Sequence, residues 1–270
     1  MTVIRPPGRF DFPRLSELWG ARDVLYQFGR RDVVLRYRQT AIGVLWVVIQ
    51  PLAAAGVFAI VFGGIADLPS GNVPYVLFGM AGVLIWNVFS GIITRASGSL
   101  VANQSLVSKV YFPRALIPLS SVLAVLLDFA VGFGLLVVMS IFYQNNPGWA
   151  VLTLPFWLLC AILLACGIGL ATCAITVKYR DVIYALPWII QILLYATPVA
   201  YSMDAVPTDL KWLFNLNPLT WLMEGSRWAT LGQAMPPAWQ IVALPVVGMA
   251  LLVAGGAVFQ KMERGFADVI

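Results

Sequence analysis

Six long apolar runs constrain the fold of this 270-residue chain more than any other feature of its sequence. Hydrophobic residues make up 60% of the chain and charged residues only 11%, against about 25% charged in soluble domains. A helix of about 20 apolar residues spans the ~30 Å hydrocarbon core of a bilayer, so the runs predict membrane-spanning helices and exclude a soluble globular fold. The predicted spans are Ala41–Ala66, Val73–Ile93, Ala115–Tyr143, Leu152–Val177, Val182–Tyr201 and Trp239–Phe259.

The runs divide the chain into one membrane domain and two short polar ends. We predict an all-α integral membrane protein with a cytoplasmic tail and interface helix at residues 1–40, a six-helix transmembrane domain at 41–260 and a cytoplasmic tail at 261–270. The first run begins after about 40 mostly polar residues, which is too late for a cleavable signal peptide. All six spans are therefore expected in the mature protein.

The basic residues predict the orientation of the spans. With the N-terminus in the cytoplasm, 15 of the 17 Lys and Arg residues fall in cytoplasmic segments, as the positive-inside rule requires. Only Lys211 and Arg227 fall outside, and the even number of spans returns the C-terminus to the cytoplasm. The net charge of +5 reflects this asymmetry and contact with anionic lipids, not nucleic-acid binding. We expect a multi-pass protein of a bacterial cytoplasmic membrane.

A cationic segment adjoins the first span. Arg30, Arg31, Arg36 and Arg38 lie within nine residues directly before it, which is typical of a cytoplasmic membrane boundary. Upstream, Arg14–Gly29 carries a broad face of apolar and aromatic side chains. Such an amphipathic helix either lies in the lipid interface or packs on its own protein, and both alternatives place it at the cytoplasmic surface.

Two cytoplasmic connections between spans carry further signals. The longer one is Thr94–Arg114, and its middle, Ser99–Val110, has no Pro or Gly and predicts a short helix that Pro113 ends. The other connection consists of Lys178, Tyr179, Arg180 and Asp181. It is so short that the two spans it joins must be adjacent and antiparallel.

On the outer side, Met203–Ala238 is divided by four prolines and contains no apolar run long enough to cross the membrane. It predicts short helices that dip back into the outer leaflet, where other helices or water must satisfy their backbone groups. Leu219–Leu231 reads as one amphipathic helix. Glu224 and Arg227 are three residues apart on it and are expected to pair on one face.

Several kinds of chemistry are missing from the sequence. The chain has no histidine, which excludes His-based acid–base catalysis, His metal sites and Ser-His or Cys-His nucleophile pairs. None of its four lysines follows a glycine, so no P-loop is present. The three cysteines all lie in the fourth span and are expected to be small core residues. We predict a non-catalytic subunit without a metal or cofactor of its own. If ATP drives the protein, a second polypeptide would bind the ATP and Mg²⁺.

One acidic residue, Asp128, lies deep inside a predicted span, ~20 Å along the third helix at 1.5 Å per residue. An intramembrane carboxylate is costly and by default suggests a function. No basic residue is expected within the spans to pair with it. The sequence leaves two alternatives open: a protonated or hydrogen-bonded structural residue, or the centre of a proton-coupled carrier.

Four stretches of the sequence together resemble the motifs of one transporter family. They are Leu35–Leu52 (LRYRQTAIGVLWVVIQPL), Asn103–Pro118 (NQSLVSKVYFPRALIP), Lys178–Asp181 (KYRD) and Asn217–Leu231 (NPLTWLMEGSRWATL). Their order, spacing and predicted topology are similar to the membrane subunits of ABC-2 type ABC transporters. The resemblance is greatest to the polysaccharide-export permeases (the Wzm, KpsM and TagG group).

The resemblance implies a six-span subunit that works as a homodimer with two copies of a separate ATPase and a channel at the dimer interface. It implies that the helix between spans two and three docks on the ATPase, that the amphipathic N-terminal helix acts as a gate, and that the outer helices shape the exit. The docking residues would be Asn103, Gln104, Ser105 and Lys109.

The implied substrate is a glycan carried on a polyprenyl diphosphate lipid. Guanidinium groups match phosphate oxygens, so the arginine cluster before the first span would suit the diphosphate at the cytoplasmic entrance. Plain topology charge is the alternative explanation for each of these arginines. Other possible functions are export of teichoic acid, drugs or small lipids by the same fold, a proton-coupled carrier, or a membrane-embedded lipid or glycan enzyme.

Overall fold

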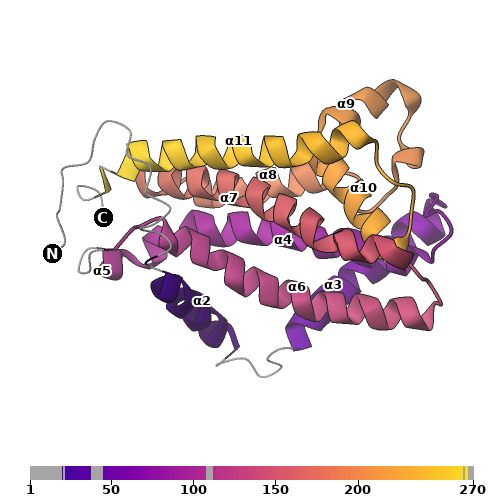
Figure 1. Cartoon of the computed structure of the whole chain (residues 1–270), viewed down its shortest axis with the longest axis horizontal. Helices are drawn as coiled ribbons and strands as arrows, with labels where there is room; N and C mark the ends of the chain where they lie inside the picture. The colour runs from indigo at the N-terminus through magenta and orange to yellow at the C-terminus, as the bar shows by residue number, and fades with distance from the viewer. Residues whose placement is uncertain (1–19, 21, 38–44, 108–111, 264, 267–270) are drawn as a thin grey trace.

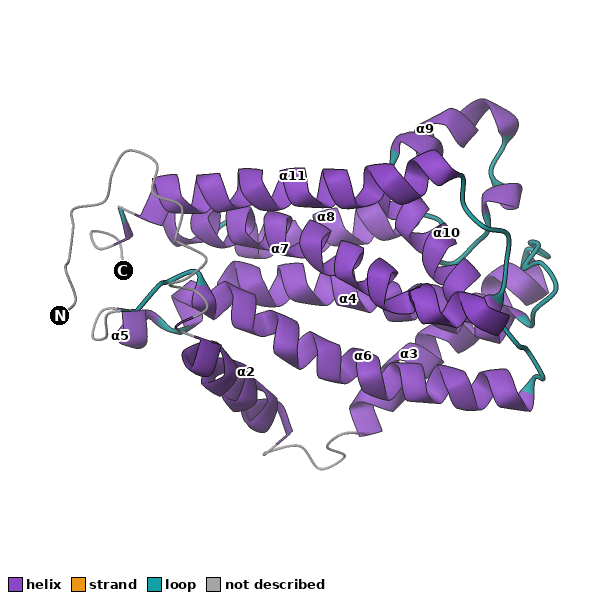
Figure 2. Cartoon of the chain, viewed as in Figure 1, coloured by secondary structure: helices purple, strands orange, loops and turns teal. Residues whose placement is uncertain are grey.

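The computed structural model describes the chain except residues 1–19, 21, 38–44, 108–111, 264 and 267–270, and every regular element in the described part is a helix (Figures 1 and 2). The longer elements are α2 (Arg22–Tyr37), α3 (Leu45–Phe58), the π-helix η1 (Ala59–Ile65), α4 (Tyr75–Ala102), α6 (Leu116–Phe142), α7 (Leu154–Lys178), α8 (Val182–Tyr195), α10 (Pro218–Leu231) and α11 (Ala238–Glu263). The shorter ones are α5 (Gln104–Val107), η2 (Gly148–Thr153), η3 (Met203–Ala205), η4 (Thr208–Leu210) and α9 (Lys211–Leu216).

Five of the described helical segments are long and apolar enough to cross a bilayer. They are Leu45–Ile65, Tyr75–Ala102, Leu116–Phe142, Gly148–Lys178 and Ala238–Glu263. The expectation of an all-helical chain with several membrane-spanning helices is confirmed. The third, fourth and sixth predicted spans agree closely with α6, with η2 and α7, and with α11.

The second predicted span was too short. We expected it to end at Ile93, but α4 continues to Ala102 and includes the first part of the predicted cytoplasmic connection. No proline occurs between Pro74 and Pro113, and Gly98 alone does not end the helix. The predicted helix at Ser99–Val110 is therefore divided: its start belongs to α4, and its middle forms the separate four-residue α5.

The fifth predicted span was too long. The helix α8 has only 14 residues, and the chain then turns over residues 196–202 instead of continuing as a helix to Tyr201. Pro198 explains this end, because the residue before a proline is driven away from the helical conformation. The expected six long spans become five long helices and one short apolar helix in the described part of the chain.

The long helix α4 lies at the centre of the bundle. It packs against α6 and α7, and α3, α8 and α10 also contact it. The helix α7 lies between α4 and α11 (Figure 1). The end of α11, the start of α6 and the α7–α8 turn lie at one end, which we call the proximal end; α9, α10 and the α6–η2 loop lie at the opposite, distal end (Figure 1).

Glycines set the close crossing of α7 and α11. A Cβ atom added to Gly255 of α11 would collide with the backbone of Gly167 on α7, and one added to Gly167 would collide with the backbone of Leu251. The backbones of the two helices therefore touch, as small residues allow in membrane proteins.

Replacing Gly255 with leucine is expected to separate α7 from α11, because an overpacked contact typically costs about 1–3 kcal/mol and here the obstacle is backbone. The matched control is Gly134→Leu on α6, where an added Cβ atom meets nothing within 4 Å. In detergent, Gly255→Leu should give less monodisperse protein by size exclusion and a lower unfolding temperature than wild type. Gly134→Leu should match wild type in both measurements. Equal behaviour of the two variants would contradict the close crossing.

Candidate functional site

The basic helix α2 rests on the proximal half of α6. A Cβ atom on the buried Gly29 would strike the side chain of Leu123, so the two helices are in close contact. The ring of Phe28 lies 5.5 Å from that of Phe112, just before α6. The interface-helix prediction placed the helix at Arg14–Gly29, but its described part begins later and continues to Tyr37.

The predicted arginine cluster is only partly described. Arg30 is exposed on α2. Arg31 donates to Asp32 at 3.0 Å, and its guanidinium carbon lies 5.4 Å from the centre of the Phe28 ring. Arg36 belongs to α2, but its side chain lies outside the described part, as does Arg38 entirely. Of the four predicted arginines, the described side chains are therefore the exposed Arg30 and Arg31, which pairs with the adjacent Asp32.

The connection between α4 and α6 starts at the proximal end with α5, and we call residues 103–107 the α5 corner (Figure 1). Asn103 ends α4, where its side-chain amide donates to the Ser99 carbonyl at 2.8 Å and its own carbonyl accepts from the Leu106 amide at 3.0 Å. Gln104 and Ser105 follow on α5, with Ser105 exposed. The structure brings these three predicted docking residues together, while Lys109 lies outside the described residues.

Arg114, which lies just before α6, is hydrogen-bonded to the end of α11. Arg114 Nη1 donates to the backbone carbonyl of Glu263 at 3.0 Å. A cation at the carboxyl end of a helix also complements the helix dipole. Arg114 thus joins the start of α6 to the end of α11.

The second predicted connection is an exposed turn. Lys178, Tyr179, Arg180 and Asp181 all have exposed side chains between α7 and α8. The Tyr179 amide donates to the Ile175 carbonyl at 2.7 Å, and Lys178 Nζ lies 5.3 Å from the Tyr179 ring centre. The two helices contact each other, so the prediction that they are neighbours is confirmed.

Asp128 has a cationic partner that we did not predict. Arg95 Nη2 donates to Asp128 Oδ2 at 3.0 Å, joining α4 to α6. The side chain of Arg95 is only 31% exposed, and that of Asp128 only 21%. We had placed Arg95 in a cytoplasmic loop, and the extension of α4 brings it into the bundle instead.

Arg227 on α10 is buried at the distal end. Its Nη2 donates to the carbonyl of Val199 at 2.6 Å, and its Nη1 donates to that of Tyr201 at 3.2 Å. The guanidinium carbon lies 3.8 Å from the centre of the Phe78 ring on α4. Gly82 provides the space, because a Cβ atom there would collide with the Val199 carbonyl and touch Arg227.

Other side chains complete the support of the 196–202 turn. Tyr75 Oη donates to the Ala200 carbonyl at 2.7 Å. The amide of Asn217, which caps α10, donates to the Ala196 carbonyl at 3.3 Å and to Thr197 Oγ1 at 3.1 Å. Side chains from α4 and α10 thus satisfy carbonyls that no helix satisfies, which non-helical backbone inside a membrane protein requires.

The predicted pair of Glu224 and Arg227 is not formed. No ion pair in the described part of the chain joins them, because the guanidinium is turned towards the 196–202 turn. Burial raises the pKa of the Glu224 carboxyl, and the nearby Arg227 charge opposes that rise. Burial also lowers the pKa of Arg227 to about 9, so the guanidinium stays protonated at neutral pH.

Comparison with known proteins decides the family. The family described as ABC-2 type transporter matches residues 24–231, more than half of the chain. The chain belongs to the ABC-2 type transporter family. The match contains all four motif stretches and confirms the resemblance that they indicated. It ends at Leu231, the last residue of α10, so the distal helices are part of the ABC-2 unit.

Individual ABC-2 relatives are similar over nearly their full lengths. An O-antigen export system permease protein RfbA from Klebsiella pneumoniae is 26% identical over 249 residues, covering 92% of this chain and 95% of that protein. A protein of the same name from Myxococcus xanthus is 26% identical over 258 residues, covering 95% and 98%. The polysialic acid transport protein KpsM from Escherichia coli is 23% identical over 242 residues, covering 87% and 91%.

Proposed function

We propose that the chain is the membrane-spanning permease subunit of an ATP-driven exporter, which moves a polyprenyl-diphosphate-linked polysaccharide out of the cytoplasm across the bacterial cytoplasmic membrane. The observation that carries the proposal is the near full-length similarity to permeases named for O-antigen export and polysialic acid transport. Similarity over nearly the whole length is expected when the same kind of substrate crosses the same kind of path.

In this proposal, α8 together with the following turn makes the sixth passage through the membrane, and the proximal end faces the cytoplasm. Basic residues support that orientation. Among the described residues, the proximal end carries Arg22, Arg30, Arg31, Arg114, Lys178, Arg180 and Lys261. Cationic residues collect on the cytoplasmic side of membrane proteins.

A second copy of the chain would complete the path. The helix α8 exposes a row of large side chains, and α3 exposes another apolar face. The row on α8 consists of Ile183, Tyr184, Trp188, Ile189, Ile192 and Tyr195. In a homodimer, these faces would meet the other copy or line the channel, where aromatic rings stack on sugars without selecting one sugar sequence.

A separate ATPase would dock at the proximal end, in two copies. Two features suit this role: the α5 corner with its exposed Ser105, and the exposed turn at Lys178–Asp181. ATP and Mg²⁺ would be held by that partner. The arginines of α2 and of the segment after it would receive the lipid diphosphate near this entrance, since guanidinium forks match phosphate oxygens.

The structure weakens the proton-carrier alternative. That alternative is centred on the carboxylate of Asp128, for which we expected no basic partner within the spans. Because Asp128 accepts from Arg95 at 3.0 Å, this pair supports a structural role for the carboxylate, one that needs no proton transport.

The proposal is tested by expressing the chain with its ATPase and measuring ATP hydrolysis and glycolipid export in the same vesicles. Leu106→Pro removes the amide that donates to the Asn103 carbonyl and should deform α5. We expect this variant to lose most export while the ATPase still hydrolyses ATP. Leu106→Ala, which keeps the amide, is the matched control and should export normally.

Two results would contradict the proposal. Export by the chain without any ATPase would remove the need for a partner. Full export by Leu106→Pro would remove the docking role of α5, while leaving the family assignment intact.

A further inference from the structure

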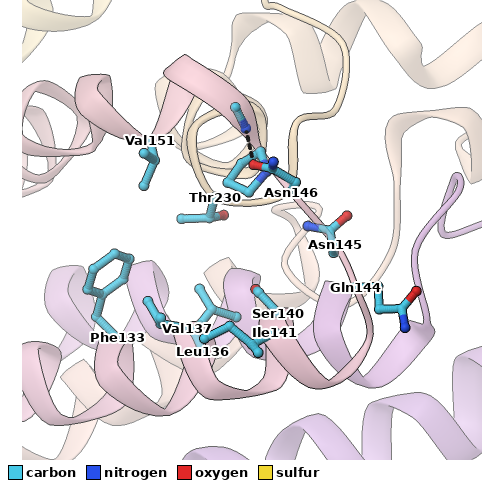
Figure 3. A pocket seen from close by; sticks show the side chains of 12 residues that line it. Phe133, Leu136, Val137, Ser140, Ile141, Gln144, Asn145, Asn146, Val151 and Thr230 are labelled. Atoms are coloured by element: carbon cyan, nitrogen blue, oxygen red, sulfur yellow. Dashed lines mark hydrogen bonds between the residues drawn. The ribbon is translucent and has the colours of Figure 1, made fainter.

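A cavity of about 460 Å³ lies at the distal end between α6, the start of the fourth span and α10 (Figure 3). Its volume falls in the range of about 300–1,000 Å³ that is usual for small-molecule sites. The apolar walls come from α6 on one side and from η2 on the other. They consist of Phe133, Leu136, Val137, Ile141 and Val151.

The polar residues of this cavity are confined mainly to one end. Figure 3 shows Gln144, Asn145 and Asn146 on the loop that closes the cavity beyond the last turn of α6. Phe142 is the last residue of this membrane-length helix, so the amides lie where a spanning helix reaches the membrane interface. The cavity is therefore apolar along α6 and polar at the interface.

Three of the polar side chains that line the cavity are engaged in hydrogen bonds. Asn146 Oδ1 accepts from the Gly148 amide at 2.9 Å, and Asn145 Nδ2 donates to the Leu231 carbonyl at 3.4 Å. Thr230 Oγ1 donates to the Ser226 carbonyl at 2.7 Å. The loop is thus held in place by its own hydrogen bonds, and the polar groups that remain lie mainly on Gln144, Asn145 and Asn146, away from the apolar walls.

The apolar walls and the lack of charged lining residues favour a hydrocarbon chain over a sugar or a phosphate as the ligand. The hydroxyl groups of a sugar unit on the aliphatic walls would lack hydrogen-bond partners, which is unfavourable for each group. A phosphate or diphosphate would need cations, and none of the residues that line the cavity is charged. A hydrocarbon chain meets neither obstacle.

We propose that this cavity binds one acyl chain of a membrane phospholipid, with the head group held outside the cavity beside the Gln144–Asn146 loop. The open side suits this source, because Val137 and Ile141 line the cavity and are also 41% and 72% exposed on the surface of the bundle. A lipid chain can enter sideways from the bilayer. The bound chain bridges α6 to α10 and supports the distal helices independently of what the protein exports.

The experiment compares Val137→Trp, which fills the cavity, with Val138→Trp at the next residue. Val138 is 62% exposed and does not line the cavity, so the control adds the same ring to the same helix. Each full-length variant is purified in mild detergent and delipidated, and the lipids that remain are measured by mass spectrometry. We expect wild type and Val138→Trp to retain a phospholipid and Val137→Trp to lose it.

A second variant protects the test against misfolding. Val151→Phe fills the cavity from the opposite wall and should lose the same lipid if Val137→Trp proves too unstable to purify. Three results would overturn the proposal: retention of the lipid by a well-folded filled variant, equal loss from Val138→Trp, or a polyprenyl lipid as the chain that wild type retains.

Discussion

Replacing Arg227 with methionine is expected to lower the stability of the folded protein sharply. Methionine leaves the carbonyls of Val199 and Tyr201 without donors, and an unsatisfied buried polar group costs about 1–3 kcal/mol. It also removes the contact with the Phe78 ring, worth about 2 kcal/mol when desolvated. We expect a loss of roughly 3 kcal/mol or more in total, measured as a lower unfolding temperature in detergent by tryptophan fluorescence.

Three variants show whether the cause is this contact. Arg180→Met makes the same change at an exposed turn and should unfold like wild type. Arg227→Lys keeps the charge but not the planar fork, so it should recover only part of the loss. Gly82→Ala should destabilise the same site from the other side, because its Cβ atom would collide with the Val199 carbonyl. Wild-type unfolding of Arg227→Met would refute this role.

Reversing the charge of Asp128 is expected to be the second severe change. Asp128→Arg would place two guanidinium groups together between α4 and α6, where a carboxylate now accepts from Arg95 at 3.0 Å. Breaking a fully buried pair costs about 3–5 kcal/mol, and the partial exposure of this pair lowers that figure. We expect little monodisperse protein from Asp128→Arg. Adding Arg95→Asp should restore much of the yield.

The control for the charge itself is Asp23→Arg on α2, since the Asp23 side chain is 92% exposed. It should leave the yield unchanged. Export by Asp128→Asn separates the two roles considered for this residue: a structural carboxylate predicts export in proportion to the folded protein, whereas a proton carrier predicts no export. An exchanged pair that recovers nothing would show that Arg95 and Asp128 do not stabilise the α4–α6 contact.

The sequence predicted the membrane class and three of the long helices well, because hydropathy alone determines where an apolar chain can cross. It failed where a helix end depends on packing. The extension of α4 through Arg95 was hidden by polar residues such as Ser97, which is buried against neighbouring helices. The absence of proline before Pro113 was the available signal for that extension.

The distal arginine was harder to predict. Its spacing from Glu224 suggested a surface pair, since charges three residues apart share a helix face. The partners of Arg227 are backbone carbonyls of a turn about 27 residues away along the chain, and no side-chain pattern indicates them. Pro198, three residues after the end of α8, was the one visible hint that the carbonyls of a turn would need donors.

Because α8 is short, the free energy of placing it in contact with lipid depends on the thickness of the bilayer. Its 14 residues rise ~21 Å at 1.5 Å per residue, against a hydrocarbon core of ~30 Å. Hydrophobic mismatch of this kind costs fractions of a kcal/mol per Å when lipid must thin to meet the helix. In a thick bilayer of long-chain lipids, states in which another protein surface covers α8 are therefore favoured over states in which α8 faces lipid. In a thinner bilayer of short-chain lipids, this difference in free energy is smaller.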